Sequence, residues 1–103
     1  LTLLFSAVDD KDYTDMIRTI LGRIRFRHVV VTQVGGYRKV PAEALAEIFR
    51  REGCPSAQAF EDTEAAFRAA RALKGEDGML FCVGSLYLVG EIKELLRKED
   101  AND

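Results

Sequence analysis

Four apolar runs of strand length recur along this chain, and a segment with helical spacing follows each of them. The expected pairs are Leu1–Val8 with a helix from Tyr13 closed by Gly22, His28–Thr32 with a helix from Pro41 to Gly53, Gln58–Phe60 with a helix from Asp62 to Gly75, and Met79–Val83 with a helix from Ser85 to about Arg97. Such alternation with short loops predicts an α/β fold, a three-layer Rossmann-like domain with a mostly parallel sheet and helices on both faces.

Two of these runs predict their own place in the sheet. Residues 1–5 and 79–83 are continuously apolar, as strands covered on both faces are, so we expect both to be central. Gln58–Phe60 is short and predicts an edge strand. Functional groups are then expected at the carboxyl edge, where the loops after Val8, Thr32, Phe60 and Val83 gather.

The bulk composition excludes several classes of protein. A chain of 103 residues with 48% hydrophobic residues predicts one soluble domain, and a net charge of −2 argues against nucleic acid or an anionic membrane as partner. Basic and apolar residues alternate where the chain enters the second strand, as expected for a strand with one face exposed to solvent; the basic ones are Arg23, Arg25, Arg27 and His28. No run is long enough to span a bilayer. We therefore predict a cytoplasmic protein with a flexible tail at residues 98–103.

Cysteine and histidine content excludes further chemistry. Cys54 and Cys82 are too few for a disulfide scaffold, and we expect both to be reduced, with Cys82 buried in its strand. His28 is the single histidine, so neither a zinc site nor a Ser–His–Asp arrangement can be assembled. No phosphate-loop motif is present. We assign no catalytic residue and no metal ligand to this chain.

Two loops at the expected carboxyl edge carry groups that suit a small anion. The Gly84-Ser85 turn leads from a strand into a helix, whose N-terminal N–H groups and the Ser85 hydroxyl can hold a carboxylate or phosphate. In the loop after the first strand, Lys11 stands between Asp10 and Asp12 and can supply a positive charge. The plain alternatives are N-cap chemistry at Ser85 and a solvated turn at residues 9–12. An acidic metal pocket like that of a receiver domain fails, because His28–Thr32 does not end in an aspartate.

Three segments together resemble a known family. The segments Phe5-Ser-Ala-Val-Asp-Asp-Lys-Asp12, Val30-Val-Thr32 and Val83-Gly-Ser-Leu-Tyr-Leu-Val-Gly-Glu91 are similar to the C-terminal domain of bacterial folylpolyglutamate synthase/dihydrofolate synthase, a relative of the Mur peptidoglycan ligases. The resemblance runs from Phe5 to about Leu96 in the same order and spacing. The Gly-Ser-Leu-Tyr-Leu-Val-Gly-Glu run belongs to the folate branch, because Mur ligases share the Gly-Ser turn but diverge after it.

This resemblance implies an ATP-dependent ligase that joins glutamate to a folate carboxylate through an acyl phosphate. It implies that Lys11 and Ser85 bind the incoming glutamate, with Asp10, Asp12, Thr32 and Gly84 as supporting positions. ATP and Mg²⁺ belong to the full-length parent, where an N-terminal P-loop ATPase domain of the same chain is the partner. The loop at residues 33–40 departs from the family pattern, so Arg38 receives no role.

The family's Asp-x-Ala-His-Asn motif is absent, and the chain begins on Leu1 inside a strand. We therefore expect a piece of a longer protein that lacks the domain's first strand and helix and is inactive alone. Two alternatives stay open at this point. One is a Mur-type ligase domain that acts on a peptidoglycan precursor, and the other is a stand-alone flavodoxin-like binding domain.

Overall fold

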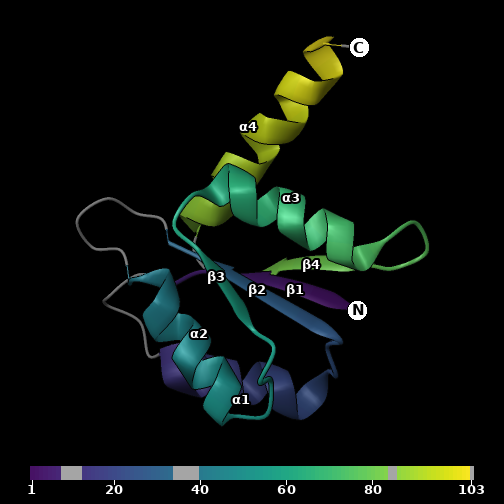
Figure 1. Ribbon diagram of the computed structural model, residues 1–103. Coiled ribbons are helices and arrows are strands. Elements are labelled where there is room, and N and C mark those ends of the chain that lie inside the picture. Colours follow the sequence, from purple (N-terminus) through teal and green to yellow (C-terminus); the bar gives the residue numbers. More distant parts are fainter. Residues whose placement is uncertain (8–12, 34–39, 84–85, 103) are drawn as a thin grey trace.

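The computed structural model describes residues 1–7, 13–33, 40–83 and 86–102 (Figure 1). Within these ranges, strands and helices alternate in sequence order, as the sequence predicted. The elements are β1 (Thr2–Phe5), α1 (Tyr13–Arg23), β2 (His28–Thr32), α2 (Ala42–Arg51), β3 (Gln58–Phe60), α3 (Thr63–Lys74), β4 (Leu80–Val83) and α4 (Leu86–Asn102).

The four strands form one parallel sheet in the order β3-β2-β1-β4. β1 pairs with β2 on one side and with β4 on the other, and β2 pairs with β3, in each case in parallel. The predicted fold class is therefore confirmed, and β3 lies at an edge as expected. The prediction that residues 79–83 form a central strand is wrong, because β4 is the other edge of the sheet in the described part of the chain.

Helices cover both faces of this sheet (Figure 1). Alternate residues of β1 and β2 point to opposite faces, which is the two-residue period of a strand. Leu3, Phe5, Val29 and Val31 pack with residues of α1 and α2, among them Ile17, Leu45 and Phe49. Leu4 and Val30 pack with Ala66, Phe67 and Ala70 of α3 and with Ile92 of α4. The domain thus has two cores separated by one sheet.

The larger core is centred on an aromatic pair. The rings of Phe5 and Phe49 meet edge to face with 5.4 Å between their centroids, and neither side chain is exposed to solvent. This geometry places the positive edge of one ring against the negative face of the other. The contact fixes α2 against β1.

Polar groups at the helix ends set where α2 and α3 begin. The Asp62 carboxylate accepts a hydrogen bond from the Ala65 N–H (3.1 Å), so Asp62 caps α3 as predicted. Gly75 ends that helix with φ 70°, a conformation that favours glycine. Pro41, predicted as the first helical residue of α2, is instead its N-cap. The side-chain oxygen of Gln33 accepts from the Ala42 N–H (3.0 Å) and supplies the cap that proline cannot.

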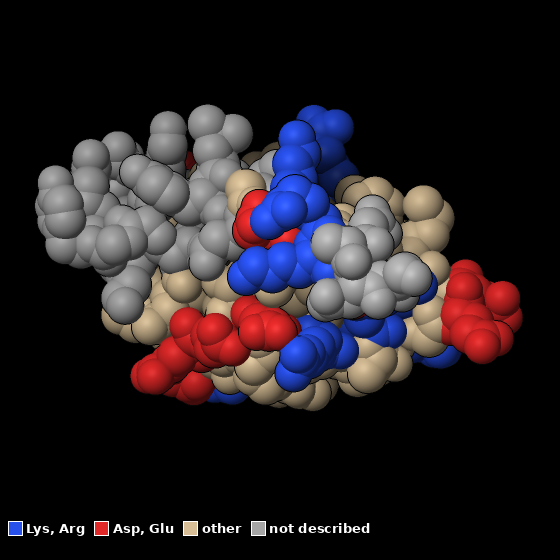
Figure 2. Space-filling model, turned by 90° about the horizontal axis from the view of Figure 1, so that it is seen from above, with Lys and Arg blue, Asp and Glu red and all other residues tan. Residues whose placement is uncertain are grey.

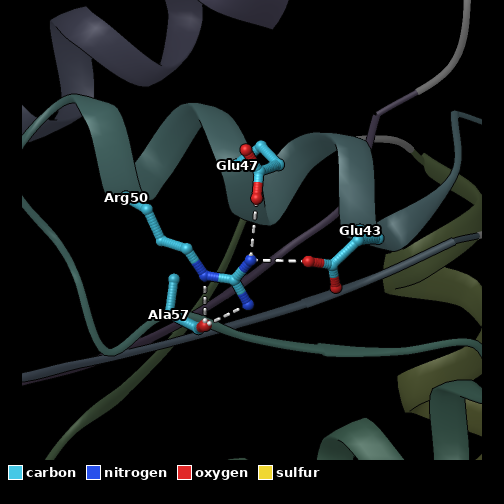
Figure 3. A network of polar contacts seen from close by, with 4 residues as sticks. All are labelled: Glu43, Glu47, Arg50 and Ala57. Atoms are coloured by element: carbon cyan, nitrogen blue, oxygen red, sulfur yellow. Dashed lines mark hydrogen bonds and ion pairs between the residues drawn. The ribbon is translucent and has the colours of Figure 1, made fainter.

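One arginine joins α2 to the segment that precedes β3 (Figure 3). The Arg50 guanidinium donates to Glu43 (2.5 Å) and Glu47 (3.2 Å) of its own helix, and its Nε and Nη2 atoms donate to the Ala57 carbonyl (3.2 and 3.0 Å). The hydrogen bond to Glu43 is the main reason that the pKa of Arg50 lies above its usual value. The planar fork of arginine suits this arrangement because it presents several donors at fixed angles.

Three local predictions need correction. Gly22 does not close the first helix: α1 continues through Arg23, and the Ile24 N–H still donates to Ile20. The last helix, predicted to end near Arg97, continues through Asn102. An ion pair from Arg71 of α3 to Glu99 of α4 (2.6 Å) joins the two helices there. Cys82, expected to be buried, is only half-buried because its strand lies at the sheet edge.

Candidate functional site at the carboxyl edge of the sheet

β1 and β4 are neighbours whose following helices leave toward opposite faces. α1 packs on the face that carries Phe5, and α4 packs on the face that carries Leu4. At the end of this strand pair the Ser6 N–H donates to the Val83 carbonyl (3.3 Å). A position where neighbouring parallel strands send their chains to opposite faces is a topological switch point, the usual ligand site of open α/β sheets.

A row of buried hydroxyl residues lies at this edge. Phe5 of β1 pairs with Val31 of β2, so Ser6 and Thr32 follow side by side, one residue further along each strand. Both residues are fully buried, and Thr63, at the start of α3, is 6% exposed. Thr32 lies opposite Phe60 of β3, on the face covered by α3 and α4. Hydroxyl side chains thus line this end of the sheet at buried positions that apolar side chains could fill equally well.

The Thr32 hydroxyl differs from its neighbours. Its Oγ1 atom is buried and has no hydrogen-bond partner among the described residues. Leaving such a group unpaired costs roughly 1–3 kcal/mol, so native proteins usually satisfy it with water or a ligand. Thr32 was predicted as a supporting position of the site. Thr63 was not predicted, although a hydroxyl residue soon after an apolar strand is the signal that could have identified it.

The remaining predicted site residues cannot be placed. Lys11, Asp10 and Asp12 fall in residues 8–12, and Gly84 and Ser85 in residues 84–85, all outside the described residues. The strands that precede two of these segments are described, however. Residues 8–12 follow β1 and residues 84–85 follow β4, which pair directly through Phe5 and Val83. Because of this sheet order, both predicted segments follow the ends of adjacent strands.

This arrangement matches that of known structures. A Mycobacterium tuberculosis folylpolyglutamate synthase complexed with ADP superposes with a TM-score of 0.76 at 24% identity, over 91% of this chain. A second structure of the M. tuberculosis enzyme, from a study with ADP and AMPPCP, gives a TM-score of 0.65 at 26% identity over 85% of this chain. The chain has the fold of a folylpolyglutamate synthase domain. The family expected from the sequence motifs is thus the family of the structures that it resembles.

A third structure extends the likeness to a bifunctional enzyme. The Yersinia pestis folylpolyglutamate synthase/dihydrofolate synthase, complexed with AMPPNP and a manganese ion, matches 93% of this chain with a TM-score of 0.68 at 21% identity. This chain spans between 21% and 23% of the length of the three folylpolyglutamate synthase structures. No family model matches the sequence, and no curated protein does.

The described residues of this folylpolyglutamate synthase fold supply little reactive chemistry themselves. Burial raises the pKa of the Cys82 thiol, which lies just before the end of β4, so this sulfur is protonated at neutral pH and a poor nucleophile. Over the described ranges, no three His, Cys, Asp or Glu side chains come together as metal ligands. We therefore assign no metal ligand among these described residues.

The described residues also form surface features away from the ends of β1 and β4. A cleft of about 300 Å³ is lined by Leu21, Ile24, Arg25, Phe26, Glu52, Gly53 and Cys54, near the ends of α1 and α2. On the side that carries α3 and α4, basic side chains gather near the middle of the view and acidic side chains lie on both sides of them (Figure 2). No helix among the described residues is both long and apolar enough to cross a membrane. The switch point at β1 and β4 is therefore the best candidate for a functional site.

Proposed function

We propose that this chain is the C-terminal domain of an ATP-dependent folylpolyglutamate synthase/dihydrofolate synthase and that its switch-point edge holds the incoming glutamate. The single observation that carries the proposal is the pairing of β1 with β4 in a folylpolyglutamate synthase fold. This pairing starts the segments of Lys11 and Ser85 from neighbouring strands. This supports a site in which two groups that each suit a carboxylate act together.

The glutamate site combines a charge with hydroxyl donors. The Lys11 ammonium pairs with one carboxylate of glutamate, and the Ser85 hydroxyl donates to a carboxylate at the start of α4. Thr32 lies two strands from β4, with β1 between them. Its unpaired hydroxyl gains a partner when ligand or ligand-bound water fills the edge. Asp10, Asp12 and Gly84 support the two loops.

The role of this domain in the reaction is to bind and orient glutamate. In a ligase of this class, the N-terminal P-loop domain would hold ATP and Mg²⁺, and transfer of the terminal phosphoryl group of ATP would convert the folate carboxylate into an acyl phosphate and release ADP. The amine of glutamate then attacks the acyl carbon, an amide forms and phosphate leaves. When the glutamate is held by its carboxylates, its amine stays free and points toward the acyl carbon. The translational and rotational entropy of glutamate is then lost on binding and no longer adds to the barrier of the chemical step. The domain by itself is then inactive.

The proposal is tested by ADP release from the full-length parent with ATP, Mg²⁺ and tetrahydrofolate, with and without glutamate. Strong dependence on glutamate is expected, and the 103-residue chain assayed alone should release no ADP. Activity confined to a UDP-muramoyl acceptor would replace the folate assignment with a Mur-type ligase. The absence of amino-acid-dependent ADP release with either acceptor would remove the ligase assignment altogether.

A further inference from the structure

Two main-chain hydrogen bonds hold the chain just beyond the end of β1. The Ser6 N–H donates to the Val83 carbonyl (3.3 Å), and the Ala7 carbonyl accepts from the Val40 N–H (3.4 Å). Ala7 and Val40 are buried, with 2% and 4% exposure, and both belong to the core on the side of α1 and α2. Ala7 is also the last described residue before the segment that carries Lys11. The position of residue 40 therefore helps to fix the point from which that segment starts.

The start of α2, which follows residue 40, is held by a side chain nine residues earlier in the chain. Pro41 is the N-cap of α2 and makes no side-chain cap hydrogen bond. The Ala42 N–H donates instead to the side-chain oxygen of Gln33 (3.0 Å), which directly follows Thr32 at the end of β2. Ala42 is buried, so its N–H depends on this acceptor. Gln33 thus joins the end of β2 to the first residue of α2.

We propose, on the basis of the glutamate site proposed above, that Gln33 is a positioning residue for the segment that carries Lys11. Gln33 holds Ala42, and Val40, two residues earlier, holds Ala7. The ends of β1 and β2 are therefore linked through residues 40–42 in addition to their pairing in the sheet. Gln33 acts on the glutamate site through these residues and makes no contact with the ligand itself.

A glutamine suits this role for two reasons. The usual N-cap residues, such as serine or aspartate at position 41, would satisfy the helix locally and would not join it to a neighbouring strand. Gln33 reaches back from the strand end and makes that connection. Its amide is also uncharged, so it brings no negative charge to an edge at which carboxylates are expected to bind.

The test compares Gln33→Met and Ala42→Pro in the full-length parent, by steady-state kinetics with glutamate and ATP varied in turn. Gln33→Met keeps a side chain of similar length without the acceptor oxygen. Ala42→Pro removes the donor, and proline is well tolerated at the first helical position. Each variant should raise the KM for glutamate about 3- to 10-fold, because small displacements of binding groups are costly, and should leave the KM for ATP unchanged. Gln58→Met, the same exchange at an exposed position of β3, should change neither constant.

Combination with Lys11→Ala separates positioning from a general structural effect. Because Gln33 acts through the Lys11 segment, Gln33→Met should raise the glutamate KM by less than about twofold when Lys11 is already removed. The two variants break the same hydrogen bond from opposite ends, so either one that folds decides the question.

Two results would overturn the positioning role and leave the glutamate site in place. One is an unchanged glutamate KM in Gln33→Met or Ala42→Pro, and the other is an equal rise caused by Gln33→Met with and without Lys11. An unchanged glutamate KM in Lys11→Ala itself would overturn the glutamate site, and the positioning role with it.

Discussion

The N–H of Ser6 donates a hydrogen bond to the carbonyl of Val83 across the ends of two strands that are far apart in the sequence. This contact joins β1 to β4 at the point where their following helices diverge to opposite faces of the sheet. The segments that carry Lys11 and Ser85 therefore follow two adjacent strands. The proposed glutamate site depends on this relationship.

Replacing Thr32 with valine should stabilise the isolated chain and impair the parent enzyme. The Thr32 hydroxyl is buried without a partner among the described residues, so its removal should raise the free energy of unfolding by about 1 kcal/mol. Urea unfolding measures the first effect, and the KM for glutamate measures the second. Thr32→Ser keeps the hydroxyl and serves as the control. A valine variant that is destabilised, with an unchanged KM, would contradict this role.

Replacing Asp62 with alanine should destabilise the fold by about 1 kcal/mol, because α3 loses the carboxylate that accepts from Ala65. The measurement is the midpoint of urea unfolding. Asp62→Asn can still cap the helix and should behave nearly as wild type, and Glu61→Ala tests the removal of an adjacent exposed charge. Equal losses at Glu61 and Asp62 would show that charge rather than capping is responsible.

Arg50→Lys should loosen the segment between α2 and β3. A lysine ammonium cannot reproduce the two hydrogen bonds to the Ala57 carbonyl together with those to Glu43 and Glu47. We expect faster hydrogen exchange at residues 54–58 and a lower melting temperature. Arg51→Lys is the matched control, because Arg51 is exposed and adjacent. Equal behaviour of the two variants would argue against the network.

Both thiols should react slowly with a disulfide reagent while the protein is folded. Burial raises the pKa of Cys54 and of Cys82, so the reactive thiolate is scarce at neutral pH and accumulates only at more alkaline pH than for a free thiol. Cys54→Ser and Cys82→Ser separate the two rates, and the unfolded chain gives the reference. Labelling as fast as in denaturant would refute the burial of these thiols.

Much of the fold follows from local patterns in the sequence. The bounds of β2 and β3 agree with the predicted runs. Asp62 caps the start of α3 and Gly75 its end, as predicted, because capping and turn residues act on backbone only a few positions away. Gly22 misled the prediction of the end of α1, since a single glycine weakens a helix without ending it. The continuation of α4 through residues 98–102 was missed because the polar composition there suggested a tail, although several of these residue types also form helices well.

The place of β4 could not be predicted for a different reason. An apolar run shows that a strand is suited to burial on both faces, but it does not show which strands flank it. The order of strands depends on where α3 returns the chain, and α3 crosses the face of β1 and β2 to bring β4 beside β1. For the same reason, the sequence could not predict that Ser6 and Thr32 lie side by side.

The most direct test of the account is the glutamate dependence of ADP release in the full-length parent carrying Lys11→Ala. Loss of a charge-assisted contact worth roughly 1.5–3 kcal/mol predicts a rise in the glutamate KM of about 10- to 100-fold, with the KM for ATP unchanged. Lys74→Ala, at the far end of α3, should leave both constants at their wild-type values. An unchanged glutamate KM in Lys11→Ala would contradict the glutamate site at this edge.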